Sequence, residues 1–490
     1  MDYPDPDVIR VEDTYYMVST TMHFMPGCEI LQSFDLVHWE HVTYVYETLD
    51  HTDAQQLKSG QNIYGQGMWA ASLRYHEGRF CICFVANDTR KTYLYTSEKI
   101  DGPWKKQLIE GFYHDGSLLF DEDGRNYIVY GNDEIWITEL NEDLTAPKKD
   151  GLHRLLVSDH KNPELGYEGS HIQKINGYYY IFLVHSLRDH WMRTEACFYS
   201  DSLEGEFTGG DVLCDDRGYC GQGVAQGGIV DTPDGKWYAM LFQDSGAVGR
   251  IPILVPVTWK DHFPVFGQNG HVPEEIEVHS TRPGYIYQPL VGSDDFCNGL
   301  LPRWQFNHDP DPRYYHLDAL QGTYTITTRE VCTELTQAVN TLTQRMSYPS
   351  CAAEVTVDAS ALKEGDVAGL CALQGCYAAV GITKHHGKYE VLMLDKKEDG
   401  ILDMTERTVV ESHQMDFRLE ADFCNMKDEA RCYYRVNKGD WLPIGTVHKL
   451  YFKLDHFTGC RFGLFCYAAE ETGGSACFRD FKYYDVDEIS

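Results

Sequence analysis

The chain has 490 residues, more than one hydrophobic core normally supports, so we expect two domains. Its formal net charge of −33 excludes nucleic acids and anionic membranes as partners, because both bind basic surfaces, and leaves a neutral ligand. Aromatic residues make up 13% of the chain, including 33 tyrosines, which favours β structure and surfaces that stack on flat or sugar-like ligands.

The sequence also indicates a cellular compartment. No run of about 18 apolar residues is present, so a transmembrane helix is excluded. The first ten residues, MDYPDPDVIR, lack the basic and apolar segments of a secretory signal. The 16 cysteines form no C-x-x-C pair, and several, such as Cys81 and Cys83, fall in strand-like runs typical of buried thiols. We therefore expect a cytoplasmic protein without zinc or thioredoxin-like chemistry.

Five copies of one pattern occupy the first part of the chain. In each copy a polar turn precedes an aromatic, apolar run suited to a strand, as in NGYYYIFLV, where Asn176-Gly177 is a strong hairpin signal. The copies lie at residues 12–20, 77–85, 123–131, 176–184 and 234–242. A spacing of roughly 45 to 65 residues is typical of propeller blades. We predict a five-bladed β-propeller over residues 1–285, with a sandwich of antiparallel hairpins as the alternative.

A different rhythm of strands begins after the segment TRPGYIYQPLVGSDDF, residues 281–296. Runs such as AAEVTVDAS and KYEVLMLDKK alternate in polarity, turns containing glycine separate them, and helical periodicity is nearly absent. Pro283 and Gly284 mark the connector. We therefore expect a β-sandwich over residues 286–490 and an all-β protein.

Three acidic residues stand just ahead of strands that we expect to be the innermost of their blades. Asp5 lies between Pro4 and Pro6 in YPDPD, Asp115 occurs in GFYHDGSLLF, and Glu168 ends a glycine-flanked loop in GYEGSHIQK. Taken singly, each is equally typical of a turn or a solvated loop. The starts of innermost strands converge on a propeller axis, so acids at equivalent points of successive repeats are expected to meet in one pocket.

Three carboxyl groups in one pocket suit the hydrolysis of a glycosidic bond with inversion. One carboxylate acts as the base on water, and one carboxylic acid protonates the leaving oxygen. An unperturbed glutamic acid titrates near ~4.3 and is ionised at neutral pH. A neighbouring carboxylate raises the pKa of the acid, because like charges at short range disfavour ionisation of both groups. The third acid would supply this effect.

These motifs resemble those of glycoside hydrolase family 43, the five-bladed propeller hydrolases that include β-xylosidases and α-L-arabinofuranosidases. The similar segments are YPDPDVIRVEDTYYMVSTT, HDGSLLFDEDGRNYIVYG and YEGSHIQKINGYYYIF, and the resemblance covers most of the chain. It implies that Asp5 is the general base, that Glu168 is the general acid, and that Asp115 modulates the pKa of that acid.

The same resemblance implies several residues that bind the substrate. Trp69 in GMWAASLRYHEGRF would flank the sugar in the −1 subsite, with blade packing as the alternative. Phe24 and Met25 in MHFMPGCEIL lie in a loop whose aromatic residue lines that subsite in the family, and Met25 stands where β-xylosidases tend to have phenylalanine. Arg250 in GAVGRIPILVPVTW would bind sugar hydroxyls and approach the acids, with a salt bridge at a blade edge as the alternative.

Gln226 in GVAQGGIVDT departs from the family pattern, in which a histidine often lies near the propeller axis. We expect Gln226 to bind substrate through hydrogen bonds, but glutamine cannot titrate or act as an imidazole ligand. We therefore assign no metal site, and a structural calcium ion is not supported by the sequence. No organic cofactor is implied. Ser170 and Ala71 replace proline in two motifs, which is typical of a divergent subgroup.

The second domain resembles the concanavalin-like sandwich that follows the propeller in β-xylosidases of this family. The segments concerned are PLVGSDDF, GDVAGLCALQ and FTGCRFGLFCYA. In the family such a domain packs on the propeller and can lend a loop to the rim of the active site. We expect the same arrangement here.

Together these observations predict an exo-acting, inverting β-xylosidase that releases terminal xylose, and also arabinofuranose, from hemicellulose oligosaccharides. The expected partner is a neutral oligosaccharide, and a homo-oligomer is compatible with the sequence. One alternative is an α-L-arabinofuranosidase. A second is a retaining fructosidase-type propeller, whose N-D-P-N-G and R-D-P motifs are missing here. A third is a non-catalytic carbohydrate-binding propeller, against which the retention of all three acids speaks.

Overall fold

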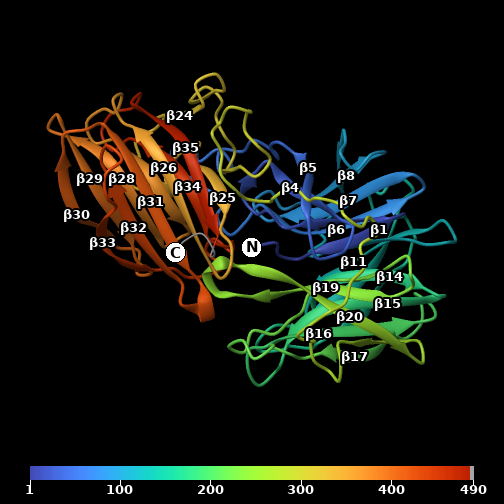
Figure 1. The fold of residues 1–490 in the computed structure, drawn as a ribbon. Coiled ribbons are helices and arrows are strands. Elements are labelled where there is room, and N and C mark those ends of the chain that lie inside the picture. Colours follow the sequence, from blue (N-terminus) through green and yellow to red (C-terminus); the bar gives the residue numbers. More distant parts are fainter. Residues whose placement is uncertain (486–490) are drawn as a thin grey trace.

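The computed structural model describes residues 1–485 (Figure 1). Its regular secondary structure is almost entirely β-strand, and the strands form two domains that lie side by side. The all-β prediction is confirmed. The helical elements of these residues are four short 3-10 helices: η1 (Lys58–Gly60), η2 (Gly246–Val248), η3 (Leu335–Gln337) and η4 (Cys424–Met426). None of the helices described is long and apolar enough to cross a membrane.

The first domain is the predicted five-bladed propeller, because five separate four-stranded antiparallel sheets follow one another along the chain. Blade 1 consists of β1 (Asp7–Val11), β2 (Thr14–Ser19), β4 (Gly27–Ser33) and β5 (Glu40–Tyr46). Blade 2 consists of β6 (Met68–His76), β7 (Arg79–Ala86), β8 (Lys91–Ser97) and β9 (Lys105–Ile109). Blade 3 is β10 (Ser117–Phe120), β11 (Asn126–Asn132), β12 (Glu134–Leu140), β13 (His153–Ser158). Blade 4 consists of β14 (Glu168–Ile175), β15 (Tyr178–Ser186), β16 (Arg193–Ser200) and β17 (Thr208–Leu213). Blade 5 consists of β18 (Ile229–Asp231), β19 (Trp237–Asp244), β20 (Arg250–Lys260) and β21 (Phe263–Phe266).

The hairpin between β14 and β15 illustrates how the repeated sequence pattern forms a blade. Asn176 and Gly177 have φ values of 50° and 85°, as the tight turn requires. Successive side chains of β15 then point to opposite faces of the sheet. Ile181 is buried in the cluster shared with blade 3, whereas Phe182 is buried in the cluster shared with blade 5. Both faces of the blade are therefore apolar.

Polar side chains join the blades near the propeller axis. Arg74 of blade 2 donates hydrogen bonds from Nη1 to Oδ2 of Asp7 in blade 1, at 2.7 Å, and from Nη2 to Oγ of Ser117 in blade 3, at 2.7 Å. The same Nη2 approaches the carbonyl oxygen of Ile172 in blade 4 at 3.3 Å. One guanidinium thus ties together four blades, which fixes the relative positions of the loops above them.

The second domain is a sandwich of two large sheets. One sheet has the order β3 (Phe24–Met25), β22 (Gln305–Asn307), β25 (Leu342–Arg345), β34 (Arg461–Tyr467), β27 (Val367–Leu373), β28 (Tyr377–His385), β29 (Lys388–Lys396), β30 (Leu402–Val410). The other has the order β23 (Tyr315–Asp318), β24 (Thr323–Thr327), β35 (Ser475–Asp485), β26 (Ser350–Asp358), β31 (Gln414–Asp422), β32 (Glu429–Arg435), β33 (Leu442–Lys449).

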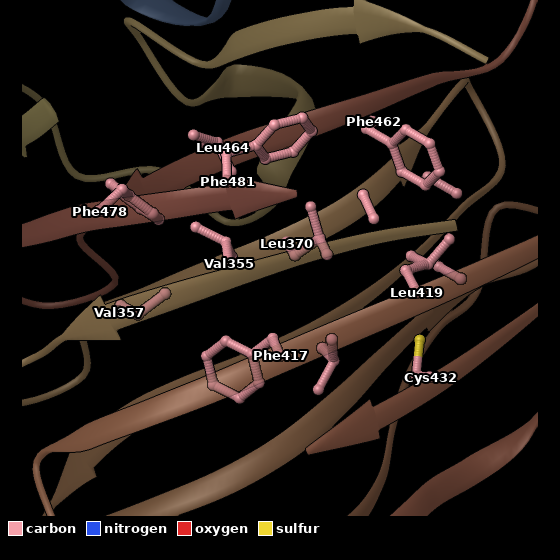
Figure 2. Close-up of a cluster of buried hydrophobic side chains, with 14 of the residues drawn as sticks. Val355, Val357, Leu370, Phe417, Leu419, Cys432, Phe462, Leu464, Phe478 and Phe481 are labelled. Atoms are coloured by element: carbon pink, nitrogen blue, oxygen red, sulfur yellow. The ribbon is translucent and has the colours of Figure 1, made fainter. Parts of the chain in front are cut away.

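Apolar side chains from both sheets of the sandwich meet in one buried core (Figure 2). Leu370 and Leu464 come from the first sheet, and Val355, Phe417 and Phe478 come from the second. Each of these side chains is at most 1% exposed. The alternating polarity of the sequence therefore places one face of each sheet in a common interior, as expected for a sandwich.

The two domains share a sheet as well as an interface. The short strand β3 leaves blade 1 and pairs with β22 of the sandwich, with Met25 opposite Phe306. Nearby, Arg345 forms a buried ion pair of 2.8 Å with Glu29 of blade 1. The connector runs from the end of β21 at residue 266 to the start of β22 at residue 305, and it includes the predicted boundary at 285/286.

Candidate active site

A cavity of about 1010 Å³ lies between the propeller and the sandwich. Blades 2 to 4 contribute Trp69, His114 and Glu168 to its lining, and the sandwich contributes the segment 449–454 and Phe457. Trp69 and Glu168 are two of the predicted site residues. Asp5, Asp115 and Arg250 are almost fully buried. Arg250 contacts Phe457 of the lining, Asp115 contacts Gly169 next to Glu168, and Asp5 contacts Arg250.

Asp5 is held by two side chains that point at its carboxylate. Nη1 of Arg250 donates to Oδ1 at 3.0 Å, and the hydroxyl of Thr20 donates to Oδ2 at 2.6 Å. The backbone of Asp5 has a φ of 51°, in the left-handed region that few residues other than glycine adopt. Asp5 is therefore both oriented and ionically paired.

Asp115 has the same backbone signature, with a φ of 47°. Its Oδ2 accepts a hydrogen bond of 3.0 Å from the backbone N–H of Gly169, the residue after Glu168. Nε2 of His114 lies 3.6 Å from the same oxygen. The contact to Gly169 fixes blade 3 against the start of β14, so Asp115 and Glu168 keep a constant separation.

Glu168 is the first residue of β14 and reaches into the cavity. Its Oε2 accepts a hydrogen bond of 2.6 Å from Nδ2 of Asn132 and lies 3.5 Å from Nε2 of His114. One oxygen of Glu168, one oxygen of Asp115 and one ring nitrogen of His114 all lie within 4.8 Å of one another. The arrangement brings two carboxyl groups close enough to influence each other's ionisation.

The charges of this cluster shift the pKa of two of its members. Burial raises the pKa of Asp115 to about 6, the charge on His114 opposes that rise, and the charges on Glu168 and Asp5 add to it. The carboxylate of Asp115 raises the pKa of His114 to about 9 against the effect of burial, and Glu168 contributes further. At neutral pH His114 is therefore an imidazolium ion between two acids.

Aromatic side chains from both domains enclose the acids. The rings of Trp69 and Phe457 are 5.8 Å apart between centroids, and Trp69 is also 5.8 Å from the ring of His114. Phe457 covers the guanidinium of Arg250 at 4.1 Å, and its carbonyl oxygen accepts a hydrogen bond of 3.3 Å from Nη2 of the same arginine. The sandwich thus supplies part of the wall around the acids, as the resemblance implied.

Gln226 lies directly behind the loop that carries Glu168. A Cβ atom on Gly169 would come within 2.7 Å of Cγ of Gln226, and Gly169 has a φ of 65°, so only glycine fits at this position. The backbone N–H of Gln226 donates to Oε2 of the buried Glu195 at 2.7 Å. Gln226 therefore packs beneath the acid; its binding of substrate stays a prediction.

Phe24 and Met25 are placed differently from the prediction that they line the sugar subsite. They form β3 and pair with the sandwich, and both are 1% exposed. The ring of Phe24 stacks under the guanidinium of Arg461 at 3.4 Å. The physical reason is the neighbouring strand β22, whose free edge recruits this segment of blade 1 as an additional strand.

The cluster of His114, Asp115 and Glu168 is also the place where a metal ion would find ligand atoms in this site. A cation bound there would compete with the proton that a general acid must carry. Asn132 and the backbone of Gly169 already donate hydrogen bonds to the two acids.

Some residues of the site escaped the sequence analysis. His114 stands in the motif HDGS directly before Asp115, and the presence of a titratable ring beside a proposed acid was a usable signal. Asn132 occurs in a strand, and Phe457 lies more than 200 residues from Arg250. Nothing in the local pattern of either residue indicates the contact it makes.

Comparison with protein families gives two matches that together cover most of the chain. Residues 1–264 match the model of glycosyl hydrolases family 43. Residues 293–484 match the model of the β-xylosidase C-terminal concanavalin A-like domain. The first match covers the propeller and all three acids, and the second covers the sandwich.

Several known proteins are similar over the whole length of the chain. A β-xylosidase of Formosa agariphila is 27% identical over 99% of this chain and 88% of its own length. Xylosidase/arabinosidase 43B of Humicola insolens is 25% identical over 98% of this chain and 95% of its own length. The structure of a bifunctional GH43-CE protein of Bacteroides eggerthii superposes with a TM-score of 0.92 at 42% identity. That alignment covers 100% of this chain and 63% of the other chain.

Proposed function

Because the chain belongs to glycosyl hydrolase family 43, we propose that it is an exo-acting, inverting β-xylosidase that removes terminal xylose from hemicellulose oligosaccharides. It is a glycoside hydrolase by family. One observation supports the assignment of roles above all others. Oxygen atoms of Asp115 and Glu168 lie within 4.8 Å of each other, while Asp5 forms an ion pair with Arg250.

In the proposed reaction Asp5 is the base. The positive charge of Arg250 stabilises the ionised carboxylate, and the hydroxyl of Thr20 fixes its orientation toward the attacking water. As the water attacks the anomeric carbon, its proton passes to Asp5 and the configuration at that carbon inverts. A base that is rigidly held needs little reorganisation at this moment.

Glu168 is the proposed acid, and it gives its proton to the oxygen of the leaving sugar. Asp115 is the neighbouring acid: burial raises its pKa to about 6, and the charge on Glu168 adds to that rise. His114 adds a positive charge that limits the repulsion between the acids.

The preference for xylose is supported by relatives that carry this activity in their names. A relative named xylosidase/arabinosidase supports α-L-arabinofuranosidase activity as a second candidate. The reaction uses carboxyl groups and water and needs no organic cofactor.

The decisive measurement compares kcat/KM of the purified enzyme for the two 4-nitrophenyl pentosides, β-D-xylopyranoside and α-L-arabinofuranoside. We expect the xyloside to be preferred. Proton NMR of the xylose first released from 4-nitrophenyl β-D-xylopyranoside should show the α-anomer. A β-anomer would contradict inversion, and a higher kcat/KM on the arabinofuranoside would reverse the substrate assignment.

A further inference from the structure

The cavity extends well beyond the three acids, and its lining contains cations as well as aromatic rings. A volume of about 1010 Å³ is at the upper end for ligand cavities, which commonly enclose about 300–1,000 Å³. It is therefore large enough for more than the terminal sugar. The cationic side chains of the lining are Arg90, His114, Arg193, Lys449 and Lys453.

Four of these five cations already have acceptors inside the protein. His114 lies between Asp115 and Glu168. Nε of Arg193 donates to Asp244 at 2.9 Å. The ammonium of Lys449 donates to two backbone carbonyls, and that of Lys453 donates to Glu398. Their charges are therefore neutralised, or their donors are occupied, before any ligand arrives.

Arg90 is different. No ion pair or side-chain hydrogen bond joins it to any residue of the described part of the chain, 1–485. Its guanidinium instead stacks on the ring of Phe112, with the central carbon 3.9 Å from the ring centroid. Stacking restricts the side chain and covers one face of Phe112, so the pair offers a ligand the N–H donors of the guanidinium. These donors are free to bind an acceptor in the cavity.

The position of the pair relates it to the leaving group. Phe112 is two residues before His114, and the ring of His114 contacts Glu168, the proposed acid. Because the acid protonates the leaving oxygen, the wall beside it faces the sugars on the leaving side of the scissile bond. Arg90 and Phe112 therefore lie where a substituent of the leaving oligosaccharide can reach them.

The chemistry of the wall selects an anionic substituent. A guanidinium binds a carboxylate with two parallel hydrogen bonds, and such charge-assisted pairs are about twice as strong as neutral ones. Two other acids of the lining, Glu164 and Asp428, are in no ion pair with the described residues and repel a carboxylate. An acidic group would therefore be accepted at one place in the cavity.

We propose that Arg90, stacked on Phe112, forms a leaving-side subsite for the carboxylate of a uronic acid branch on a xylo-oligosaccharide. The inference rests on the proposed glycosidase function and adds the class of substituent that the site accepts. A neutral oligosaccharide bound beside Arg90 and Phe112 does not form this ion pair. The enzyme thus removes xylose from acidic, branched oligosaccharides in preference to branched neutral ones.

The test uses two matched substrates, a xylo-oligosaccharide with a uronic acid branch on its leaving side and the same compound with the carboxyl group reduced to an alcohol. The variants are Arg90→Gln and, as a matched control, Arg125→Gln, an exposed arginine of blade 3 paired with Asp123 outside the cavity. We expect the ratio of kcat/KM for the acidic over the reduced substrate to fall about tenfold in Arg90→Gln. The ratio should be unchanged in Arg125→Gln.

The preference should also weaken in 0.5 M salt, because a partly exposed ion pair is screened. An unchanged ratio in Arg90→Gln, or equal losses on both substrates, would overturn the subsite. If the enzyme hydrolyses no xyloside at all, the proposed function fails independently. The subsite is then decided by calorimetric binding of the acidic oligosaccharide, which Arg90→Gln must weaken for the inference to stand.

Discussion

The guanidinium of Arg250 lies 4.1 Å from the ring of Phe457, and this contact joins the propeller to the sandwich at the active site. The same guanidinium donates to Asp5, the proposed base. The second domain therefore contacts the proposed base through one intermediate residue, Arg250. It acts as a wall of the site and also determines the position of the arginine that orients the base.

Replacement of Phe457 by alanine should lower kcat/KM for 4-nitrophenyl xyloside by about tenfold or more, because Arg250 loses the ring that covers it and the cavity loses one wall. The propeller and the core of the sandwich do not depend on this half-buried ring. Circular dichroism and the Tm should therefore change little. Leu320→Ala, an exposed position of the sandwich, is the control. Unimpaired kcat/KM in Phe457→Ala would contradict the role of the second domain.

The pH dependence of kcat/KM should respond in opposite directions to two substitutions in the acid cluster. Asp115→Asn removes a negative charge from the acid cluster, so the basic limb moves to lower pH. His114→Gln removes a positive charge at 3.5 Å from Glu168, so the basic limb moves to higher pH. The shifts require full pH profiles on one substrate. If the basic limb moved in the same direction in both variants, the charges of Asp115 and His114 would not determine its position.

Asp115 also makes stability depend on pH. Its pKa is raised in the folded protein to about 6 from an ordinary value of 3.8, so the folded state binds the proton more tightly than the unfolded state. The resulting contribution is fully present below pH 3.8 and is lost as the pH rises to 6. Asp115→Asn should therefore raise the Tm relative to wild type more at pH 7 than at pH 4. An equal difference at both pH values, measured by calorimetry, would contradict the shift.

Three buried histidines near the domain interface should have the opposite effect at low pH. His456 stacks on Tyr64 at 3.9 Å, His308 and His23 lie in the same aromatic cluster, and burial lowers the pKa of His456 to about 4. Burial also lowers the pKa of the other two. Neutral histidine is thus required for folding, and stability that is present above pH 6.5 is lost as the pH falls toward 4.

The variant His456→Phe keeps an aromatic ring on Tyr64 but cannot take up a proton. Its Tm should therefore fall less steeply between pH 6.5 and pH 4 than that of the wild type. His316→Phe, on the sandwich strand β23 away from this cluster, should retain the wild-type slope. Identical slopes for wild type and His456→Phe would mean that His456 does not titrate in this range.

Local patterns in the sequence were sufficient for the features that depend on one hairpin. The turn at Asn176-Gly177 and the alternating run after it specify a strand buried on both faces, and five such units specify a propeller. The same logic located Asp115 and Glu168, because each stands next to the start of an inner strand and the closed ring brings those starts together.

Features that depend on contacts between domains were not accessible in this way. The pair Phe24–Met25 reads as a loop of blade 1, and only the free edge of β22, more than 250 residues later, makes it a strand of the sandwich. Phe457 likewise has no local signal that places it over Arg250. Such contacts depend on how the two folded domains pack together. The polarity pattern within either domain does not predict this packing.

The proposed role of Glu168 leads to a test that separates acid catalysis from other defects. In Glu168→Ala the leaving oxygen receives no proton, so kcat/KM on xylobiose should fall by about 10²–10⁴-fold, the range typical of general acid–base catalysis. 4-Nitrophenyl xyloside has a leaving group that departs as a stable anion, and the loss on this substrate should be much smaller. Glu204→Ala, an exposed acid in a turn of blade 4, serves as the control for both substrates. Equal losses on xylobiose and the aryl xyloside would mean that Glu168 does not donate the proton, since a residue that only shapes the site affects both substrates alike.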